Sequence, residues 1–179
     1  EEPTSGRIRS AAGLTLPGTP GIASGRTTDL AWSITYACLD AIDSWIEDCR
    51  DGAFRRGDEW VPFQVREETI RPKGQPPIKL KFHENLHGTL LGDPSEPGLY
   101  LATRWSSAEG TTADSTTALW EILHASTVEQ GISIVSGLRN GSWCLVLGDR
   151  SGSIGFQMTG NCPIRRPGAS GLAPLPGWD

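Results

Sequence analysis

The sequence has 179 residues, of which 37% are hydrophobic and 21% charged, and its formal net charge is −5. This length and composition indicate an ordinary globular domain and exclude a disordered chain. The 16 basic residues are scattered along the chain, which argues against nucleic acid or an anionic membrane as partner, because both require a clustered basic face.

Extended segments dominate the first two thirds of the chain. Residues 1–28 are rich in Gly, Pro, Ser and Thr, which predicts irregular chain with extended pieces. Residues 30–35 are predicted to form a buried strand. Further strands are expected at residues 60–70, 78–82 and 99–105, with a turn at Arg71–Gly74 between the first two of these.

Helices are expected only near the middle of the second half. Residues 117–124 have helical spacing, and Ser126 with Glu129 forms a capping-box pattern that predicts a second helix ending near Gly137. Two short apolar strands follow, at residues 143–147 and 154–158. Strands, a helix pair and more strands predict a mixed, layered α+β fold.

The cysteines and histidines form no metal-binding pattern. No two cysteines have Cys-x-x-Cys spacing, and the three histidines do not complete a zinc motif. His83 and His87 would share one face of a helix, but the residues before them alternate as in a strand, so a metal role for this pair is disfavoured. The sequence shows no signal peptide and no apolar run long enough to cross a bilayer, which leaves the compartment open.

The last stretch of the chain carries the most specific motif. Asp149 is followed by a Gly-x-Ile-Gly-aromatic run, then by a Gly-x-x-Pro-x-Arg turn that ends at Arg165, and finally by Pro174-Leu175-Pro176-Gly177. This segment resembles a signature of the penicillin acylase family, the N-terminal-nucleophile amide hydrolases. Similar matches occur in order along nearly the whole chain, at Gly13–Ile22, Asp40–Asp43, Arg66–Ile70, His87-Gly88 and Leu101–Trp105.

The resemblance implies a four-layered αββα sandwich and hydrolysis of an amide. In this mechanism an amino-terminal serine attacks with its hydroxyl, and its own α-amine serves as the base. The chain begins with Glu1, and its alignment with the family places Glu1 inside the nucleophile-bearing subunit. We therefore expect residues 1–179 to be a penicillin acylase β-subunit-like domain that is incomplete at its N-terminus and inactive alone.

The resemblance also places the oxyanion hole. Its backbone donor corresponds to Tyr36, and its asparagine corresponds to Cys144, whose thiol is a weak donor. Asn140 lies four residues earlier and would need a local insertion to take the asparagine's place. Two alternatives for Cys144 are a new nucleophile, for which the sequence offers no nearby base, and a buried core cysteine, which is favoured. Arg165 matches an arginine that supports the asparagine and the substrate in the family. The alternative interpretation is that Arg165 is a surface residue.

The resemblance also implies a calcium site, whose ligands match Asp40, the backbone carbonyl of Ile42, and Asp43. Carboxylates and carbonyls on an irregular loop suit this ion. The ion would be structural, with further ligands from later in this chain and from the partner subunit. The alternative is a solvated acidic helix face formed by Asp40, Asp43 and Glu47.

Two functions remain open at this point. The first is an amidase or acyltransferase that acts on an N-acyl amide such as a β-lactam, an N-acyl homoserine lactone or a natural-product intermediate. It would require a second polypeptide that carries the nucleophile, a smaller subunit, or both. The second is a degenerate relative that acts as a binding or scaffolding partner or uses a repurposed pocket. A periplasmic or secreted location follows if the protein behaves as the family does.

Overall fold

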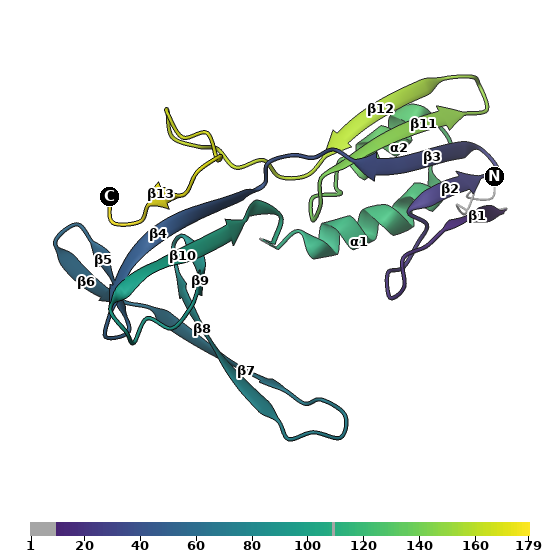
Figure 1. Ribbon diagram of the computed structural model, residues 1–179. Helices are drawn as coiled ribbons and strands as arrows, with labels where there is room; N and C mark the ends of the chain where they lie inside the picture. The colour runs from purple at the N-terminus through teal and green to yellow at the C-terminus, as the bar shows by residue number, and fades with distance from the viewer. Residues whose placement is uncertain (1–9, 109) are drawn as a thin grey trace, which may run out of the picture. The chain divides into compact units, whose positions relative to one another are not determined.

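A computed structural model describes residues 10–108 and 110–179 (Figure 1). The expectations about Glu1 therefore fall outside the described residues. The internal contacts of the chain divide it into two compact units. Among the described residues, the first unit contains residues 10–41, 106–108 and 110–162, and the second contains residues 42–105 and 163–179. Each unit has a hydrophobic core of its own.

The first unit is built on a five-stranded antiparallel sheet with the strand order β1-β2-β3-β11-β12. The strands are β1 (Ala11–Leu14), β2 (Ser24–Thr27), β3 (Leu30–Tyr36), β11 (Trp143–Asp149) and β12 (Ile154–Thr159). The central pair joins distant parts of the chain, with Trp32 opposite Leu147 and Tyr36 opposite Trp143. The strand predicted at residues 30–35 and the two closing strands are confirmed.

Two α-helices accompany this sheet in the described part of the unit. Helix α1 (Thr112–Glu121) continues into the 3-10 helix η2 (Ile122–His124), and helix α2 (Val128–Val135) follows. The Thr127 hydroxyl accepts a hydrogen bond from the Gln130 amide at 3.3 Å, and the Gln130 side chain accepts one from the Ser126 amide at 2.9 Å. The cap of α2 is therefore Thr127, one residue later than the capping-box pattern predicts.

Asp149, at the end of β11, holds the turn into β12 and the start of α2 together. Its Oδ2 accepts a hydrogen bond from the Val128 amide at 3.0 Å, and its Oδ1 accepts bonds from the amides of Ser151 and Ser153. Hydrogen bonds from the Ser151 side chain and from the Val128 amide hold the pKa of Asp149 below its usual value. An ionised side chain here suits the positive end of the helix dipole.

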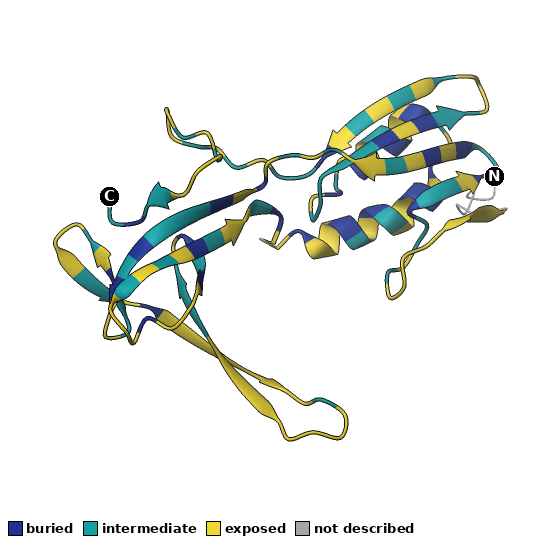
Figure 2. Ribbon diagram, in the orientation of Figure 1, coloured by how far each residue is buried: buried dark blue, intermediate teal, exposed yellow. Residues whose placement is uncertain are grey.

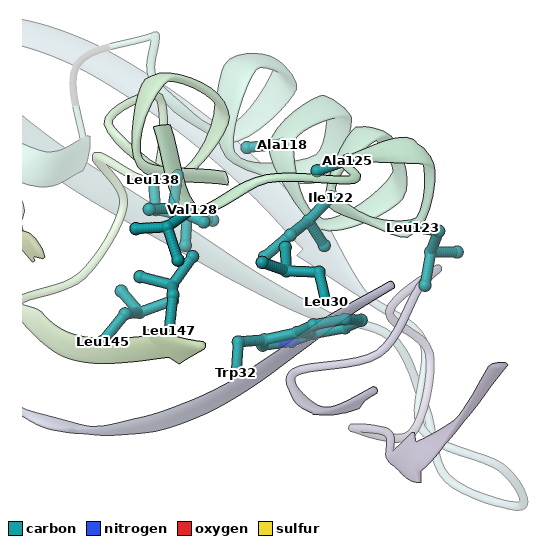
Figure 3. Close-up of a cluster of buried hydrophobic side chains, with 11 residues drawn as sticks. Leu30, Trp32, Ala118, Ile122, Leu123, Ala125, Val128, Leu138, Leu145 and Leu147 are labelled. Carbon is teal, nitrogen blue, oxygen red and sulfur yellow. The ribbon is translucent and has the colours of Figure 1, made fainter. Parts of the chain in front are cut away.

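The core of the first unit lies between the sheet and the helices (Figure 3). Leu30 and Trp32 of β3 and Leu145 and Leu147 of β11 alternate with outward-facing residues, and therefore share the inner face. They meet buried helix side chains such as Ile122. Each fully buried aliphatic side chain contributes about 1.5–3 kcal/mol to folding. Helix α2 approaches closely at Gly155 of β12, where a Cβ would lie 2.4 Å from Cγ1 of Val128.

The opposite face of this sheet is apolar and exposed. Along β12, exposed residues alternate with less exposed ones (Figure 2). This face carries Val146 of β11 and Ile154, Phe156 and Met158 of β12, whose residue exposures are 57%, 85%, 57% and 44%. In the ladder Val146 lies opposite Phe156. We call these four residues the open sheet face. No described element of the first unit covers it.

The second unit is built on a larger sheet with the order β6-β5-β4-β10-β9-β8-β7, and β13 pairs with β4 in addition. Its strands are β4 (Ile42–Arg50), β5 (Ala53–Arg56), β6 (Glu59–Pro62), β7 (Gln64–Ile70), β8 (Ile78–Asn85), β9 (Gly88–Leu91), β10 (Gly98–Trp105) and β13 (Leu175–Pro176). The core consists of Cys49, Phe54, Phe63, Leu90 and Ala102. The strand predicted at residues 78–82 is confirmed as part of β8, which forms a hairpin with β7 around the Arg71–Gly74 turn. The strand predicted at residues 60–70 is divided at Phe63 into β6 and β7, which lie at opposite edges of the sheet.

The segment that contains Asp43 and Glu47 is a strand. The alternative of a solvated acidic helix face is therefore wrong. Because side chains of a strand alternate, Asp43, Trp45 and Glu47 share one face of β4, and both carboxylates are buried, at 7% and 0% exposure.

The described residues form a mixed, sheet-rich fold with few helices. Among them, no helix has the length and apolar character needed to cross a membrane.

Candidate functional site

Tyr36 and Cys144 lie on neighbouring strands at one end of the first sheet. Tyr36 is the last residue of β3, and Cys144 is the second residue of β11, directly opposite Thr35. The ring of Tyr36 stacks on that of Trp143 with a centroid distance of 5.0 Å. The structure therefore brings together the two residues that the sequence assigns to the oxyanion hole.

The backbone amide of Tyr36 lies on the open edge of β3. Ala37 donates to the Ser142 carbonyl at 3.0 Å, and Arg150 donates to the Asp29 carbonyl at 3.1 Å. Because antiparallel ladders alternate between bonded and non-bonded pairs, Tyr36 belongs to a non-bonded pair, and its N–H points away from β11. On that side β2 pairs only with Ala31 and Trp32. Within the described residues, no strand covers the Tyr36 edge.

Cys144 projects from the face opposite the helices. Its neighbour Leu145 points into the core, so Cys144 belongs to the same face as Val146 and lies opposite Met158 of β12. It is half-buried and forms no disulfide. A fully buried core position for Cys144, the alternative drawn from the sequence, does not describe this placement.

Asn140 lies in the loop between α2 and β11, outside the ladder. Its amide and that of Arg139 donate to the Ser115 hydroxyl, at 3.0 and 2.9 Å. Ser115 itself is buried in α1 at 1% exposure and donates to the Thr111 carbonyl. This anchoring fixes the backbone of Asn140 away from strand β11, so it does not take the register of Cys144.

Arg165 belongs to the second unit, where it forms an ion pair with Asp43 of β4. Its Nε donates to both carboxylate oxygens of Asp43, at 2.9 and 3.1 Å. The two side chains are 17% and 9% exposed. The alternative of a surface arginine is therefore inconsistent with this placement.

The predicted calcium ligands fall on either side of the division between the units. Asp40 is exposed in the first unit, whereas Ile42 and Asp43 begin β4 in the second. Among the described residues, no group of three or more His, Cys, Asp or Glu side chains is arranged to hold a metal ion. His83 and His87 likewise form no such group.

The sequence did not reveal a buried polar cluster in the second unit. Oε1 of Glu47 lies 2.7 Å from both the side-chain nitrogen Nδ2 of Asn85 and Nδ1 of His87. Burial by itself raises the pKa of Glu47, but these two hydrogen bonds and the charges of His87 and Arg56 lower it, and the net shift is downward. In the sequence, only the His87-Gly88 motif pointed to this cluster, and the motif does not indicate which residue the imidazole of His87 would contact.

Comparisons with known proteins agree with the resemblance found in the sequence. A protein-family profile described as penicillin amidase matches residues 4–179. The acyl-homoserine lactone acylase QuiP of Pseudomonas putida is 33% identical over 172 residues, and that of Pseudomonas aeruginosa is 34% identical over 186 residues. Each alignment covers 94% of this chain and 21% of the relative. The chain thus spans about a fifth of the length of these relatives.

Penicillin G acylases are more distant matches. That of Escherichia coli is 25% identical over 89% of this chain and 19% of its own length. The structure of a thermostable penicillin G acylase from Alcaligenes faecalis matches with a TM-score of 0.80 at 20% identity, over 93% of this chain and 32% of that one. The fold is therefore that of part of a penicillin acylase, and the chain belongs to the penicillin amidase family.

Proposed function

We propose that this chain is part of the nucleophile-bearing subunit of a penicillin acylase-like amidohydrolase or acyltransferase. Its substrate is an N-acyl amide, such as a β-lactam, an N-acyl homoserine lactone or a natural-product intermediate. N-acyl homoserine lactones are the first class to test, because relatives named for that substrate are 33% and 34% identical to this chain.

The observation that carries this proposal is the amide of Tyr36 on the open edge of β3. Attack on an amide carbonyl creates an oxyanion, and donors that are already fixed in place stabilise it without reorganisation. The pairing of β3 with β11 holds the Tyr36 backbone, while its N–H points away from that partner. A substrate carbonyl beside this edge would receive a hydrogen bond from a rigid donor.

The nucleophile comes from outside this sequence in our proposal. A second polypeptide brings an amino-terminal hydroxyl or thiol to the open edge, and its α-amine accepts the proton. The open sheet face supports such an assembly, since four neighbouring apolar side chains suit a second sheet about 10 Å away. Stacking a second sheet there would give the αββα sandwich.

The test removes the Tyr36 N–H together with the tyrosine ring. Tyr36→Pro lacks the donor, and no bond of the β3–β11 ladder is lost, because the N–H points away from β11. We expect kcat for the assembled protein to fall by about 10²–10³ on an acyl-amide panel, the usual cost of one oxyanion donor.

Tyr36→Ala is the matched control, because it removes the ring stacked on Trp143 and keeps the N–H. It should retain kcat within several-fold of wild type. Equal losses in both variants, with folding intact by circular dichroism, would reject Tyr36 as the donor. They would leave the family assignment unaffected.

A second candidate is a relative that binds acyl amides without hydrolysing them. Cys144 at the asparagine position favours it, because a thiol stabilises an oxyanion poorly. This candidate predicts saturable binding of an N-acyl homoserine lactone with no release of the free lactone. Turnover by the assembled wild-type protein would exclude it.

We also propose calcium as a structural ion. Asp40, the Ile42 carbonyl and Asp43 supply five oxygens at most, even if both carboxylates bind through two oxygens, whereas calcium takes six to eight. Asp43 also pairs with Arg165. These residues fit a calcium site only when ligands from elsewhere complete it. If a chelator leaves the thermal midpoint of the assembled protein unchanged, and added calcium does not raise it, this part of the proposal is wrong.

A further inference from the structure

A buried carboxylate on β4 organises the turn between β8 and β9. Glu47 is fully buried, and its Oε1 accepts hydrogen bonds from Asn85 and His87. Because a carboxylate only accepts, Nδ1 of His87 is the donor in this bond. The His87 amide donates to the Asn85 side chain at 2.8 Å, and the ring of Trp45 stacks on the imidazole at 4.7 Å. One oxygen of Glu47 is thus fully engaged.

The other oxygen of Glu47 faces the C-terminal segment. Oε2 is buried and has no hydrogen-bond partner among residues 10–108 and 110–179. Gly177 covers it so closely that a Cβ on this residue would lie 2.3 Å from Oε2 and 2.8 Å from the Ile46 carbonyl oxygen. This spacing leaves no room for a ligand or a metal ion, and it allows only a weak Cα–H···O contact. The second oxygen of the Glu47 carboxylate therefore packs against the backbone of Gly177.

Three further hydrogen bonds hold this end of the segment on the sheet. The Gly177 amide donates to the Ile46 carbonyl at 2.8 Å, and the Gly57 amide donates to the Trp178 carbonyl at 2.9 Å. A guanidinium nitrogen of Arg56 donates to the Gly177 carbonyl. The positive charge of Arg56 also acts on Glu47. Arg56 thus connects the buried carboxylate with the backbone that covers it.

We propose that residues 163–179 form a strap that closes on β4 through a latch, and that the negative charge of Glu47 keeps this latch shut. The charged carboxylate accepts hydrogen bonds from Asn85 and His87 on one side and attracts the positive charge of Arg56 on the other. Arg56 in turn donates to the Gly177 carbonyl. The latch comprises Glu47, Asn85, His87, Arg56 and Gly177, and all five residues lie in the second unit. Most of residues 164–174 are exposed, so little besides the two ends holds the strap. The inference does not depend on the proposed function.

Acid should open the latch, and the sign follows from the groups around Glu47. His87 and Asn85 face the Glu47 carboxylate from the β8–β9 side, and Arg56 faces it from β5. Burial raises the pKa of the Cys49 thiol of β4 to about 12, so this thiol stays neutral. Tyr100 of β10 pairs opposite Glu47, and its hydroxyl donates to the Glu96 carbonyl. Because the pKa of Glu47 is lowered in the fold, its stabilisation is complete above roughly pH 4.3 and is lost below it.

Hydrogen exchange of the Gly177 and Gly57 amides, corrected for intrinsic rates, tests the proposal in the full chain. In Glu47→Gln, protection of both amides at about pH 7 should fall about tenfold or more, as when one charge-assisted hydrogen bond is lost. In the wild type, protection should decrease as the pH falls below about 4.3, and this decrease should be absent in Glu47→Gln. Asp48→Asn is the control, because Asp48 lies on the other face of β4, and it should match the wild type. Wild-type protection in Glu47→Gln would overturn the proposal.

A second variant tests the same latch from the strap. Gly177→Ala leaves the Glu47 side chain unchanged but places a Cβ against Oε2. Exchange of residues 163–179 should accelerate about tenfold or more, while the β8–β9 turn keeps its protection. Gly148→Ala is the control, because the nearest atom to its new Cβ is 3.8 Å away. If Gly177→Ala leaves the strap as protected as in the wild type, the latch does not exist. This outcome decides the question without Glu47→Gln, which is useful if that variant does not fold.

Discussion

At the scale of single residues, we interpret Cys144 as the main departure of this chain from the oxyanion-hole pattern that it resembles. Its position in the ladder is well defined, opposite Thr35 and Met158. A thiol is a weaker donor than an amide. An asparagine on the same strand at position 144 would therefore support faster hydrolysis of the amide than the cysteine does.

We predict that Cys144→Asn raises kcat of the assembled protein toward an N-acyl amide, by up to about 10²–10³ if one full oxyanion donor is restored. Steady-state kinetics on the best substrate measures this. Cys144→Ala is the matched control and should leave kcat nearly unchanged, because it removes only a weak donor. A loss of activity in Cys144→Ala would instead identify the thiol as a participant in the reaction.

Only part of the candidate site was accessible from the sequence. The positions of Tyr36 and Cys144 followed from the resemblance, but the direction of the Tyr36 N–H depends on which pairs of the ladder are hydrogen-bonded. That property is set by the register with β11, more than a hundred residues away. The partners of Glu47 were hidden for the same reason, since His87 lies 40 residues away.

At the scale of elements, the packing of α2 on β12 depends on the absence of a side chain at Gly155. A Cβ there would lie 2.4 Å from Cγ1 of Val128 and 2.9 Å from Cδ1 of Ile132. Val128 is buried and β-branched, so its χ1 angle has little freedom in a helix. Strand and helix cannot both keep their places if this position gains a methyl group.

We predict that Gly155→Ala destabilises the chain by about 1–3 kcal/mol, the usual cost of overpacking. Urea denaturation at neutral pH measures the change in the free energy of unfolding. Gly148→Ala on the adjacent strand should be nearly neutral, because no atom lies within 3.8 Å of the added carbon. Equal effects of the two substitutions would show that α2 does not pack on β12 as described.

Strands with short apolar runs or alternating apolar residues could be predicted from the sequence. A strand whose buried face carries charged residues could not. In β11 and β12 the apolar residues repeat every second position or form a short run, which indicates a strand directly. In β4 the spacing of Asp43 and Glu47 suits one face of a helix as well as one face of a strand. Only their burial decides between the two, and burial depends on Arg165 and His87, which come from distant segments.

At the scale of the whole molecule, the open sheet face indicates what the first unit lacks. Its inner face is buried by α1, η2 and α2, but its outer face exposes four large apolar side chains. A contiguous apolar surface of this kind marks an interaction site in a globular protein. The proposed second sheet would cover it.

Substitution of Phe156 distinguishes a covered sheet face from an exposed one. Phe156 is 57% exposed in this chain, so Phe156→Ser should change the thermal midpoint of the isolated chain little while reducing its self-association, measured by light scattering. In the assembled protein the same side chain would be buried between two sheets, and its loss should cost roughly 3–5 kcal/mol, the range for removing a buried Phe. Leu172→Ser is the control, because Leu172 is 90% exposed outside any strand and should have little effect in either setting. An effect of Phe156→Ser that is equally small in the isolated chain and in the assembly would mean that no second layer packs on this face.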